Sequence, residues 1–135
     1  MAGTFKFELV TPERMVLSQD ASQVVVPGVE GEFTVLPGHA PVIAALRPGV
    51  VDATLADART MRIFVKGGFA EVDSDRLIVL AERALDIAAL DAASIAAELQ
   101  TAEAELAAAG NDAGRLAAAS AVAQLEALQR QPGRA

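Results

Sequence analysis

The segment Pro27–Gly49 constrains the fold more than any other part of the chain, because it alternates apolar runs with residues that force turns. It holds four of the six prolines and four of the ten glycines. Three of the prolines are each followed directly by a glycine, at residues 27–28, 37–38 and 48–49. Proline fixes φ and glycine allows positive φ, so each pair predicts a tight reversal at a defined position. This segment is therefore expected to form short extended strands that are separated by tight, rigid turns.

The part of the chain from Thr4 to about Ala81 is predicted to form a succession of short strands. Near its start, Phe5, Phe7 and Leu9 alternate with charged residues, as in a strand that buries one face. Turn-forming residues separate the later apolar runs, at residues 15–17, 23–26, 32–36, 42–46, 50–55, 61–65, 69–72 and 77–80. This pattern predicts a β sandwich of about ten short strands.

The composition changes near Ala84, where glycine, proline and β-branched residues give way to Ala, Leu, Glu and Gln. Residues 85–130 are predicted to form two helices, with Asp91 as the first N-cap and Gly110-Asn111-Asp112 as the break between them. Apolar residues recur at helical spacing at positions 95, 99, 102 and 106, and again at 118, 122, 125 and 128. A short connection predicts an antiparallel α-helical hairpin. We therefore assign residues 1–84 to a β-sandwich domain and 85–135 to a two-helix C-terminal domain.

The predicted hairpin is rich in alanine, which buries little apolar surface. Each buried CH₂ contributes only about 0.8 kcal/mol, so its hold on the sandwich is expected to be weak. Two interpretations follow from the sequence. The hairpin is either docked and released in function or a stable C-terminal appendage.

Composition and charge exclude several classes of function. The net charge is −7, which opposes binding to the phosphate backbone of nucleic acids. The chain has no cysteine and one histidine, so a protein-held metal site is not expected. The longest uncharged stretch, residues 33–46, is interrupted by proline and is shorter than the roughly 20 residues of a membrane-spanning helix. Any membrane connection is therefore expected to run through a partner.

The only histidine, His39, stands in a Gly-His-Ala-Pro turn close to Glu30 and Glu32. A histidine with a carboxylate can act as a general acid and base, so an alternative hypothesis is a small ligand-binding or enzymatic β sandwich that uses His39 and Glu32. A histidine in such a turn is more often a hydrogen-bonding or interface residue. Polar loops on a rigid scaffold favour binding, because little ordering entropy remains to be lost. An interaction protein is therefore the leading interpretation.

Four blocks, EGEFTVLPGHAP, LRPG, KGGFAEV and VLAERA, occur in an order and spacing that resemble the epsilon subunit of bacterial F-type ATP synthases. The resemblance covers nearly the whole chain. It implies a non-catalytic central-stalk subunit without cofactors, which sits with the gamma subunit on the c ring and couples proton flow to ATP synthesis. It also implies a peripheral location on the cytoplasmic face of the bacterial inner membrane.

The resemblance assigns partner-binding roles to four positions of this sequence. Glu32 occupies the position that meets the polar loops of the c ring, and His39 lies in the adjacent motif. Thr11 and Ala44 fall where the sandwich of the family faces gamma or the ring. An acid at position 32 suits an Arg or amide partner, because charge-assisted hydrogen bonds are about twice as strong as neutral ones.

The C-terminal part departs from the family pattern in two ways. The family's hairpin often inhibits rotation through basic residues that meet the catalytic alpha and beta subunits, yet residues 85–110 contain no Lys or Arg. Like charges would oppose that contact, so weak or absent inhibition is expected. Some members bind ATP through a motif with an Arg where this chain has Ser94. Nucleotide binding is therefore not expected.

Overall fold

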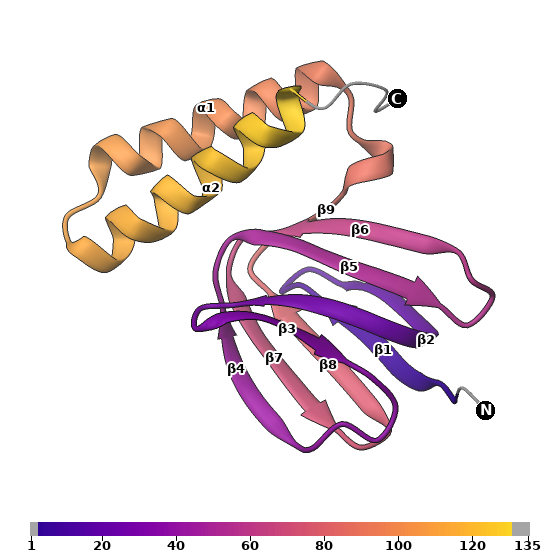
Figure 1. Cartoon of the computed structure of the whole chain (residues 1–135). Helices are drawn as coiled ribbons and strands as arrows, with labels where there is room; N and C mark the ends of the chain where they lie inside the picture. Colours follow the sequence, from indigo (N-terminus) through magenta and orange to yellow (C-terminus); the bar gives the residue numbers. More distant parts are fainter. Residues whose placement is uncertain (1–2, 131–135) are drawn as a thin grey trace.

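A computed structural model shows a β body followed by two helices, and it describes residues 3–130 (Figure 1). Nine strands precede the helices in the described part of the chain. The strands are β1 (Phe5–Val10), β2 (Met15–Gly28), β3 (Gly31–Val35), β4 (Val42–Leu46), β5 (Gly49–Leu55), β6 (Thr60–Val65), β7 (Gly68–Asp73), β8 (Arg76–Ala81) and β9 (Ala84–Asp86). A 3-10 turn, η1 (Ile87–Ala89), leads to α1 (Ala92–Ala108) and α2 (Asp112–Arg130).

The long strand β2 joins the two layers of the sandwich. Its first half pairs with β1 from Ala21 to Met15, and its second half pairs with β3 and β5. The register shifts between Ala21 and Gln23, where the strand passes from one set of partners to the other. Such an irregularity bends a strand and increases its twist. Two of the predicted apolar runs, 15–17 and 23–26, are therefore parts of one strand.

The remaining strands follow the order β1-β8-β7-β4 on one side of β2 and β5-β6-β9 on the other. Among the described residues, β1 pairs with β8 in parallel, with Phe7 opposite Leu77, and all other strand pairs are antiparallel. In the described part of the chain, β3 pairs only with β2, and β4 pairs with β2 at a single position, where Gly28 lies opposite Leu46. The facing edges of β3 and β4 are therefore unpaired along most of their length.

Two apolar clusters lie on opposite faces of β6. Ile63 and Val65 belong to the sandwich core, whose other members include Phe5, Phe7, Leu9, Val24, Val26, Leu55, Leu77 and Val79. Phe64, which is 1% exposed, points the other way into a second cluster with Ile87, Leu90, Ile95, Ala102, Ala121, Leu125 and Leu128. Strand side chains alternate between faces, so β6 connects the sandwich to the hairpin.

The two helices form the predicted antiparallel hairpin, and Figure 1 shows it lying across one end of the sandwich. The Asp91 carboxylate caps α1 by accepting a hydrogen bond from the Ser94 amide (2.7 Å), and Asn111 accepts one from the Gly114 amide (2.7 Å). Helix α1 begins at Ala92, later than position 85, because residues 84–86 pair with β6 as strand β9. The predicted stripes face the interface: Ile95, Ala102, Ala118, Leu125 and Leu128 are buried, and Leu99, Leu106 and Val122 are partly buried.

Among residues 3–130, three polar side-chain contacts join the docked hairpin to the sandwich. The Arg83 guanidinium forms a bidentate pair with the Glu98 carboxylate, and Lys66 Nζ lies 2.7 Å from Glu105 Oε1. The Ser120 hydroxyl donates a hydrogen bond to the Pro48 carbonyl (3.1 Å). The Glu98 carboxylate raises the pKa of Arg83 through these hydrogen bonds. Ionic contacts therefore supplement an apolar seam that is poor in large side chains.

Replacing Arg83 with glutamine is expected to loosen the hairpin. The Glu98 side chain is only 16% exposed, so removal of the guanidinium leaves a half-buried carboxylate unpaired. We expect a loss of about 1 to 2 kcal/mol, between the values of exposed and buried pairs. Hydrogen exchange of the α1 and α2 amides measures this loss. Arg59→Gln, which breaks the exposed pair with Asp57, is the control, and equal effects of both variants would contradict the prediction.

Candidate partner-binding surface

The β2–β3 turn holds two acidic side chains at a sharp, exposed corner. Gly28 pairs with Gly31, and Gly31 has a φ of +133°, which favours glycine. Glu30 lies in the turn, and Glu32 follows on β3 opposite the buried Pro27. Both glutamates are exposed. The tight turn therefore presents two carboxylates on a rigid support.

The loop between β3 and β4 places His39 beside that corner. The backbone amide of His39 donates a hydrogen bond to the Leu36 carbonyl (3.1 Å). The Nδ1 atom of the imidazole ring lies 2.7 Å from the Ala40 carbonyl oxygen. The imidazole ring centroid is 6.3 Å from that of Phe33 on β3. These contacts fix the ring against the edge of the sandwich.

The unpaired edges of β3 and β4 enclose a groove, which we call the edge groove. It has a volume of about 450 Å³ and is lined by Gly28, Val29, Glu30, Gly31, Phe33, His39 and residues 40–45. Two of the four predicted contact residues, His39 and Ala44, therefore lie in one groove. Glu32 stands beside it on β3, and Thr11 does not line it. Thr11 instead closes the β1–β2 turn through backbone hydrogen bonds with Arg14.

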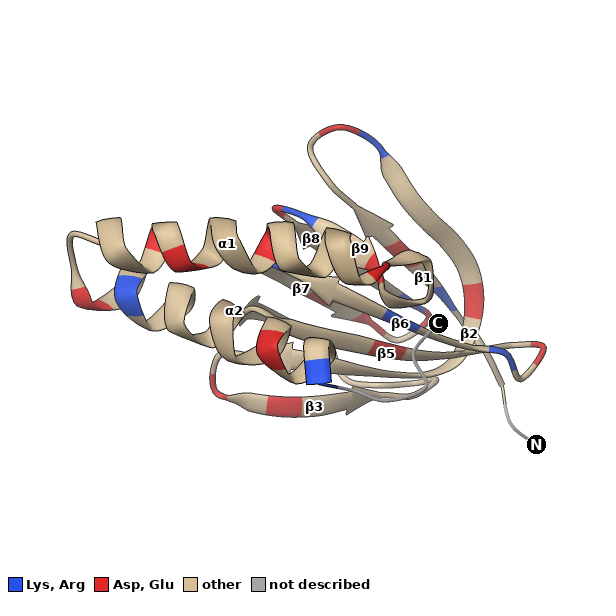
Figure 2. Ribbon diagram, turned by 90° about the horizontal axis from the view of Figure 1, so that it is seen from above, with Lys and Arg blue, Asp and Glu red and all other residues tan. Residues whose placement is uncertain are grey.

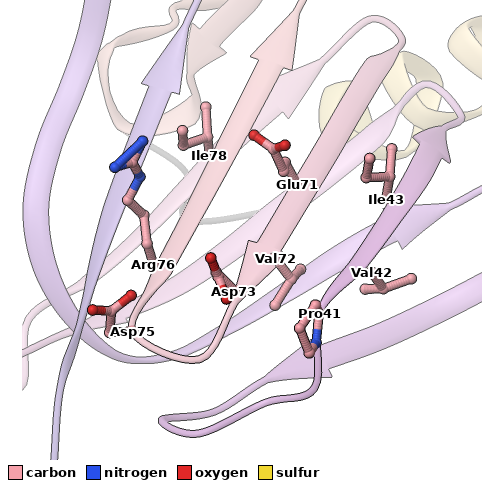
Figure 3. A pocket seen from close by; sticks show the side chains of 9 residues that line it. All are labelled: Pro41, Val42, Ile43, Glu71, Val72, Asp73, Asp75, Arg76 and Ile78. Carbon is pink, nitrogen blue, oxygen red and sulfur yellow. The ribbon is translucent and has the colours of Figure 1, made fainter.

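A second hollow of about 530 Å³ lies on the outer face of β4, β7 and β8 (Figure 3). Glu71 stands between Ile43 and Ile78 in the same cross-strand row. Asp73, Asp75 and Arg76 surround the β7–β8 turn at one end of the hollow. Its wall therefore mixes apolar and acidic groups, and Ile43, which is 71% exposed, belongs to this hollow and to the edge groove.

The outer face also carries an exposed apolar row that crosses five strand segments, which we call the outer row. The register aligns Ala45, Phe69, Leu80, Val10 and Met15. Phe69 is 55% exposed, Leu80 48% and Met15 52%. Contiguous exposed apolar surface on a soluble domain marks an interaction site. The predicted site did not include this row, although the unbroken apolar run 77–81 of β8 is typical of a strand that is covered on both faces.

Sequence comparison places these features in a known family. Residues 4–87 match the family described as "ATP synthase, Delta/Epsilon chain, beta-sandwich domain". The "ATP synthase epsilon chain" of Rhodospirillum rubrum is 46% identical over 128 residues, which cover 95% of this chain and 96% of the relative. This chain belongs to the epsilon-subunit family of ATP synthases. The resemblance inferred from the four sequence blocks is confirmed.

Other comparisons agree with this assignment. The epsilon chain of Maricaulis maris is 43% identical over 96% of both chains. A chain in the Euglena gracilis mitochondrial ATP synthase has the same fold, with a TM-score of 0.71, 22% identity, and coverage of 93% of this chain and 79% of that one. A chain in the structure of the Tetrahymena thermophila mitochondrial ATP synthase central stalk and c ring gives a TM-score of 0.67 at 16% identity, with coverage of 94% of this chain and 97% of that one. The predicted β sandwich with a C-terminal helical hairpin is thus confirmed.

Family membership also decides between the two functional classes. An epsilon chain is a non-catalytic subunit of the ATP synthase complex, which displaces the hypothesis of an enzyme built on His39 and Glu32. Within the described residues, no hydrogen bond or ion pair joins these two side chains; the His39 ring contacts the Ala40 carbonyl and Phe33. None of the helices in residues 3–130 is long and apolar enough to cross a bilayer.

Proposed function

We propose that this chain is a rotor subunit of a proton-translocating F-type ATP synthase, where it links gamma to the c ring and couples ion flow to ATP synthesis. Family membership supports this assignment, and the exposed outer row is the observation that carries it. An isolated domain gains nothing from leaving Phe69, Leu80 and Met15 in water, whereas a permanent partner would cover them. We assign the outer row to gamma.

The β2–β3 turn with its two glutamates, Glu30 and Glu32, is assigned to contact the c ring. Glu32 is exposed on a short strand whose turn is fixed by Gly31, and His39 is held beside it. A rigid corner loses little conformational entropy on binding and does not yield under load. Thr11 lies in the turn between Val10 and Met15, at the end of the outer row, and Ala44 lies in the edge groove. The membrane connection then runs through the ring, on the cytoplasmic face of the bacterial inner membrane.

Replacing Leu80 with arginine tests the assignment of the outer row. The substitution places a charge in the middle of the row, beside Phe69 and Val10. Loss of a central interface residue costs about 2 kcal/mol or more, so we expect about tenfold or greater weakening of the complex with gamma, measured by calorimetry. Ala56→Arg, in the exposed β5–β6 turn, is the control. Normal binding by Leu80→Arg would refute the assignment.

Replacing Glu32 with lysine is expected to weaken coupling. The change removes a carboxylate and brings a like charge to a partner loop that carries Arg or amide groups. Hydrogen bonds to charged groups contribute about 1.5 to 3 kcal/mol, so the contact with the ring should weaken by about tenfold or more. ATP-driven proton pumping in membrane vesicles should fall relative to ATP hydrolysis. Glu103→Lys, on the exposed face of α1, is the control, and unchanged pumping by Glu32→Lys would count against the proposal.

The hairpin is proposed to inhibit ATP hydrolysis weakly or not at all. Figure 2 shows acidic residues along α1, and the described part of the hairpin carries Glu98, Glu103, Glu105, Asp112 and Glu126 against Arg115 and Arg130. Contact with acidic loops of the alpha and beta subunits would therefore bring like charges together. Nucleotide binding is also not proposed. Ser94 occupies the position where the ATP-binding motif has an Arg, and its backbone amide donates the hydrogen bond to Asp91 that caps α1.

A further inference from the structure

A third groove, which we call the tip groove, lies between the end of the hairpin and the sandwich. It has a volume of about 780 Å³. The β4–β5 turn and the β6–β7 turn form its floor, and the α1–α2 connection with the first half of α2 forms its wall. In Figure 1 the tip of the hairpin extends past β4. On the sandwich side the groove is lined by Leu46 of β4 and by Gly68 and Phe69 of β7.

The wall of the tip groove consists mostly of small side chains, with Glu105 and Leu116 as the larger exceptions. The hairpin contributes Ala109, Ala113, Gly114, Ala117, Ala118 and Ala121. Small residues allow the backbone of another helix to approach closely, since the distance between packed helices depends on the side chains at the contact. The wall is held in place by the Ser120–Pro48 hydrogen bond and the Lys66–Glu105 ion pair. The groove is therefore shaped for a helix and is fixed at two points.

The floor of the tip groove carries Arg47, a cation that has no ion-pair partner within residues 3–130. Arg47 is partly buried, and its backbone amide donates a hydrogen bond to the Pro27 carbonyl (3.0 Å). Among the described residues, no carboxylate lies within 4.0 Å of its guanidinium. Glu105 is already paired with Lys66, and Glu82 also lines the groove but is exposed to solvent. A partly buried guanidinium in an apolar groove favours an occupant that brings a carboxylate.

The tip groove is continuous with the outer row. Phe69 lines the groove and also belongs to the row. Two further exposed apolar side chains border the groove, Val29 from the sandwich (55% exposed) and Leu116 from α2 (74% exposed). A partner that covers the outer row would therefore reach the hairpin at the groove.

We propose that the tip groove receives an amphipathic helix of the same stalk partner, gamma, and that an acidic residue of this helix pairs with Arg47. This inference rests on the proposed function, because it takes the partner to be the protein that covers the outer row. A helix laid into a groove between two elements contacts both of them. The partner thus binds the sandwich together with the docked hairpin. Gamma binding and hairpin docking are therefore thermodynamically linked. Bound gamma stabilises the docked hairpin, and undocking of the hairpin lowers the affinity for gamma.

Binding of full-length variants to the gamma subunit of the same synthase tests this inference. Arg47→Gln removes the charge, and Leu116→Asp places a carboxylate on an exposed residue that the fold does not need. We expect each variant to bind about tenfold more weakly, as for loss of a charged hydrogen bond or an interface anchor. Ala119→Asp, on the same helix but outside the groove, is the matched control. Gamma should also slow hydrogen exchange of amides 113–118 in the wild-type chain.

The possible outcomes separate this inference from the proposed function. If Leu80→Arg weakens binding while Arg47→Gln and Leu116→Asp bind normally, gamma covers only the outer row and the inference is wrong. If the wild-type chain does not bind gamma at all, the proposed function is wrong, and the inference that rests on it is wrong with it. If Leu116→Asp instead abolishes self-association of the isolated chain, the occupant is a second copy and the inference also fails. Unfolding midpoints in urea identify a variant whose weaker binding comes from misfolding.

Discussion

Replacing Gly68 with alanine is expected to leave the sandwich unfolded or barely folded. Gly68 has a φ of +127°, and a Cβ placed on it would lie 1.9 Å from the Leu80 carbonyl oxygen and 2.9 Å from the Ala81 Cα. Both atoms belong to the backbone of β8, so the strand itself would have to move. We expect a loss of more than about 4 kcal/mol, a large part of the 5 to 15 kcal/mol that stabilises a typical small domain.

Gly31 provides the matched control for this variant. Its φ of +133° is nearly the same, but an added Cβ would have no heavy atom of the described residues within 4 Å, apart from those of Gly31 and its two chain neighbours. Gly31→Ala should therefore cost only the backbone strain, about 1 to 2 kcal/mol. Urea unfolding followed by far-UV circular dichroism suits both variants, because the chain has no tryptophan to report by fluorescence. Similar losses for the two variants would show that the close approach of β7 to β8 is not the cause.

Replacing Phe64 with alanine is expected to undock the hairpin while the sandwich stays folded. Phe64 is the largest buried side chain in the cluster that joins β6 to the helices. Truncation of a buried phenylalanine costs about 3 to 5 kcal/mol, and here the cavity opens at the hairpin interface. Hydrogen exchange should show loss of protection in α1 and α2, with the strands still protected.

The neighbouring residue on β6 gives the contrasting result. Ile63 is 1% exposed and points into the sandwich core, so Ile63→Ala should cost about 2 to 5 kcal/mol throughout the molecule. Protection should then fall together in strands and helices. Equal loss of protection in both parts for Phe64→Ala would show that sandwich and hairpin unfold as one unit, and this would contradict the prediction.

Local signals predicted most of the fold. The alternation of Phe5, Phe7 and Leu9 marked a strand, Pro37-Gly38 and Pro48-Gly49 marked breaks between strands, and Asp91 marked the start of a helix. The reversal predicted at Pro27-Gly28 was wrong in position, because this pair ends strand β2 and the turn follows at residues 29–30. The continuity of β2 was missed, because residues 18–22 are mostly polar and look like a connection when read alone. Strand β9 was also missed, since the sequence Ala84-Leu85-Asp86 favours a helix and only its pairing with β6 makes it extended.

The candidate site was less accessible from the sequence. Glu32 and His39 stood out because they are charged or rare, but the outer row depends on cross-strand register, which places Leu80 beside Val10 although 70 positions separate them in the sequence. Arg47 is one cation among several, and only the structure shows that it lies in a groove without a carboxylate partner among the described residues. Position in three dimensions, rather than residue type, identifies these groups.

The parallel pairing of β1 with β8 has a consequence for how the chain is made. A ribosome releases the first strand about 70 residues before its neighbour, so β1 waits with one edge open until Ala81 has left the exit tunnel. Contacts between such distant segments also slow folding. The sandwich therefore closes only near the end of synthesis, and a chain interrupted before β8 keeps an exposed edge that invites aggregation.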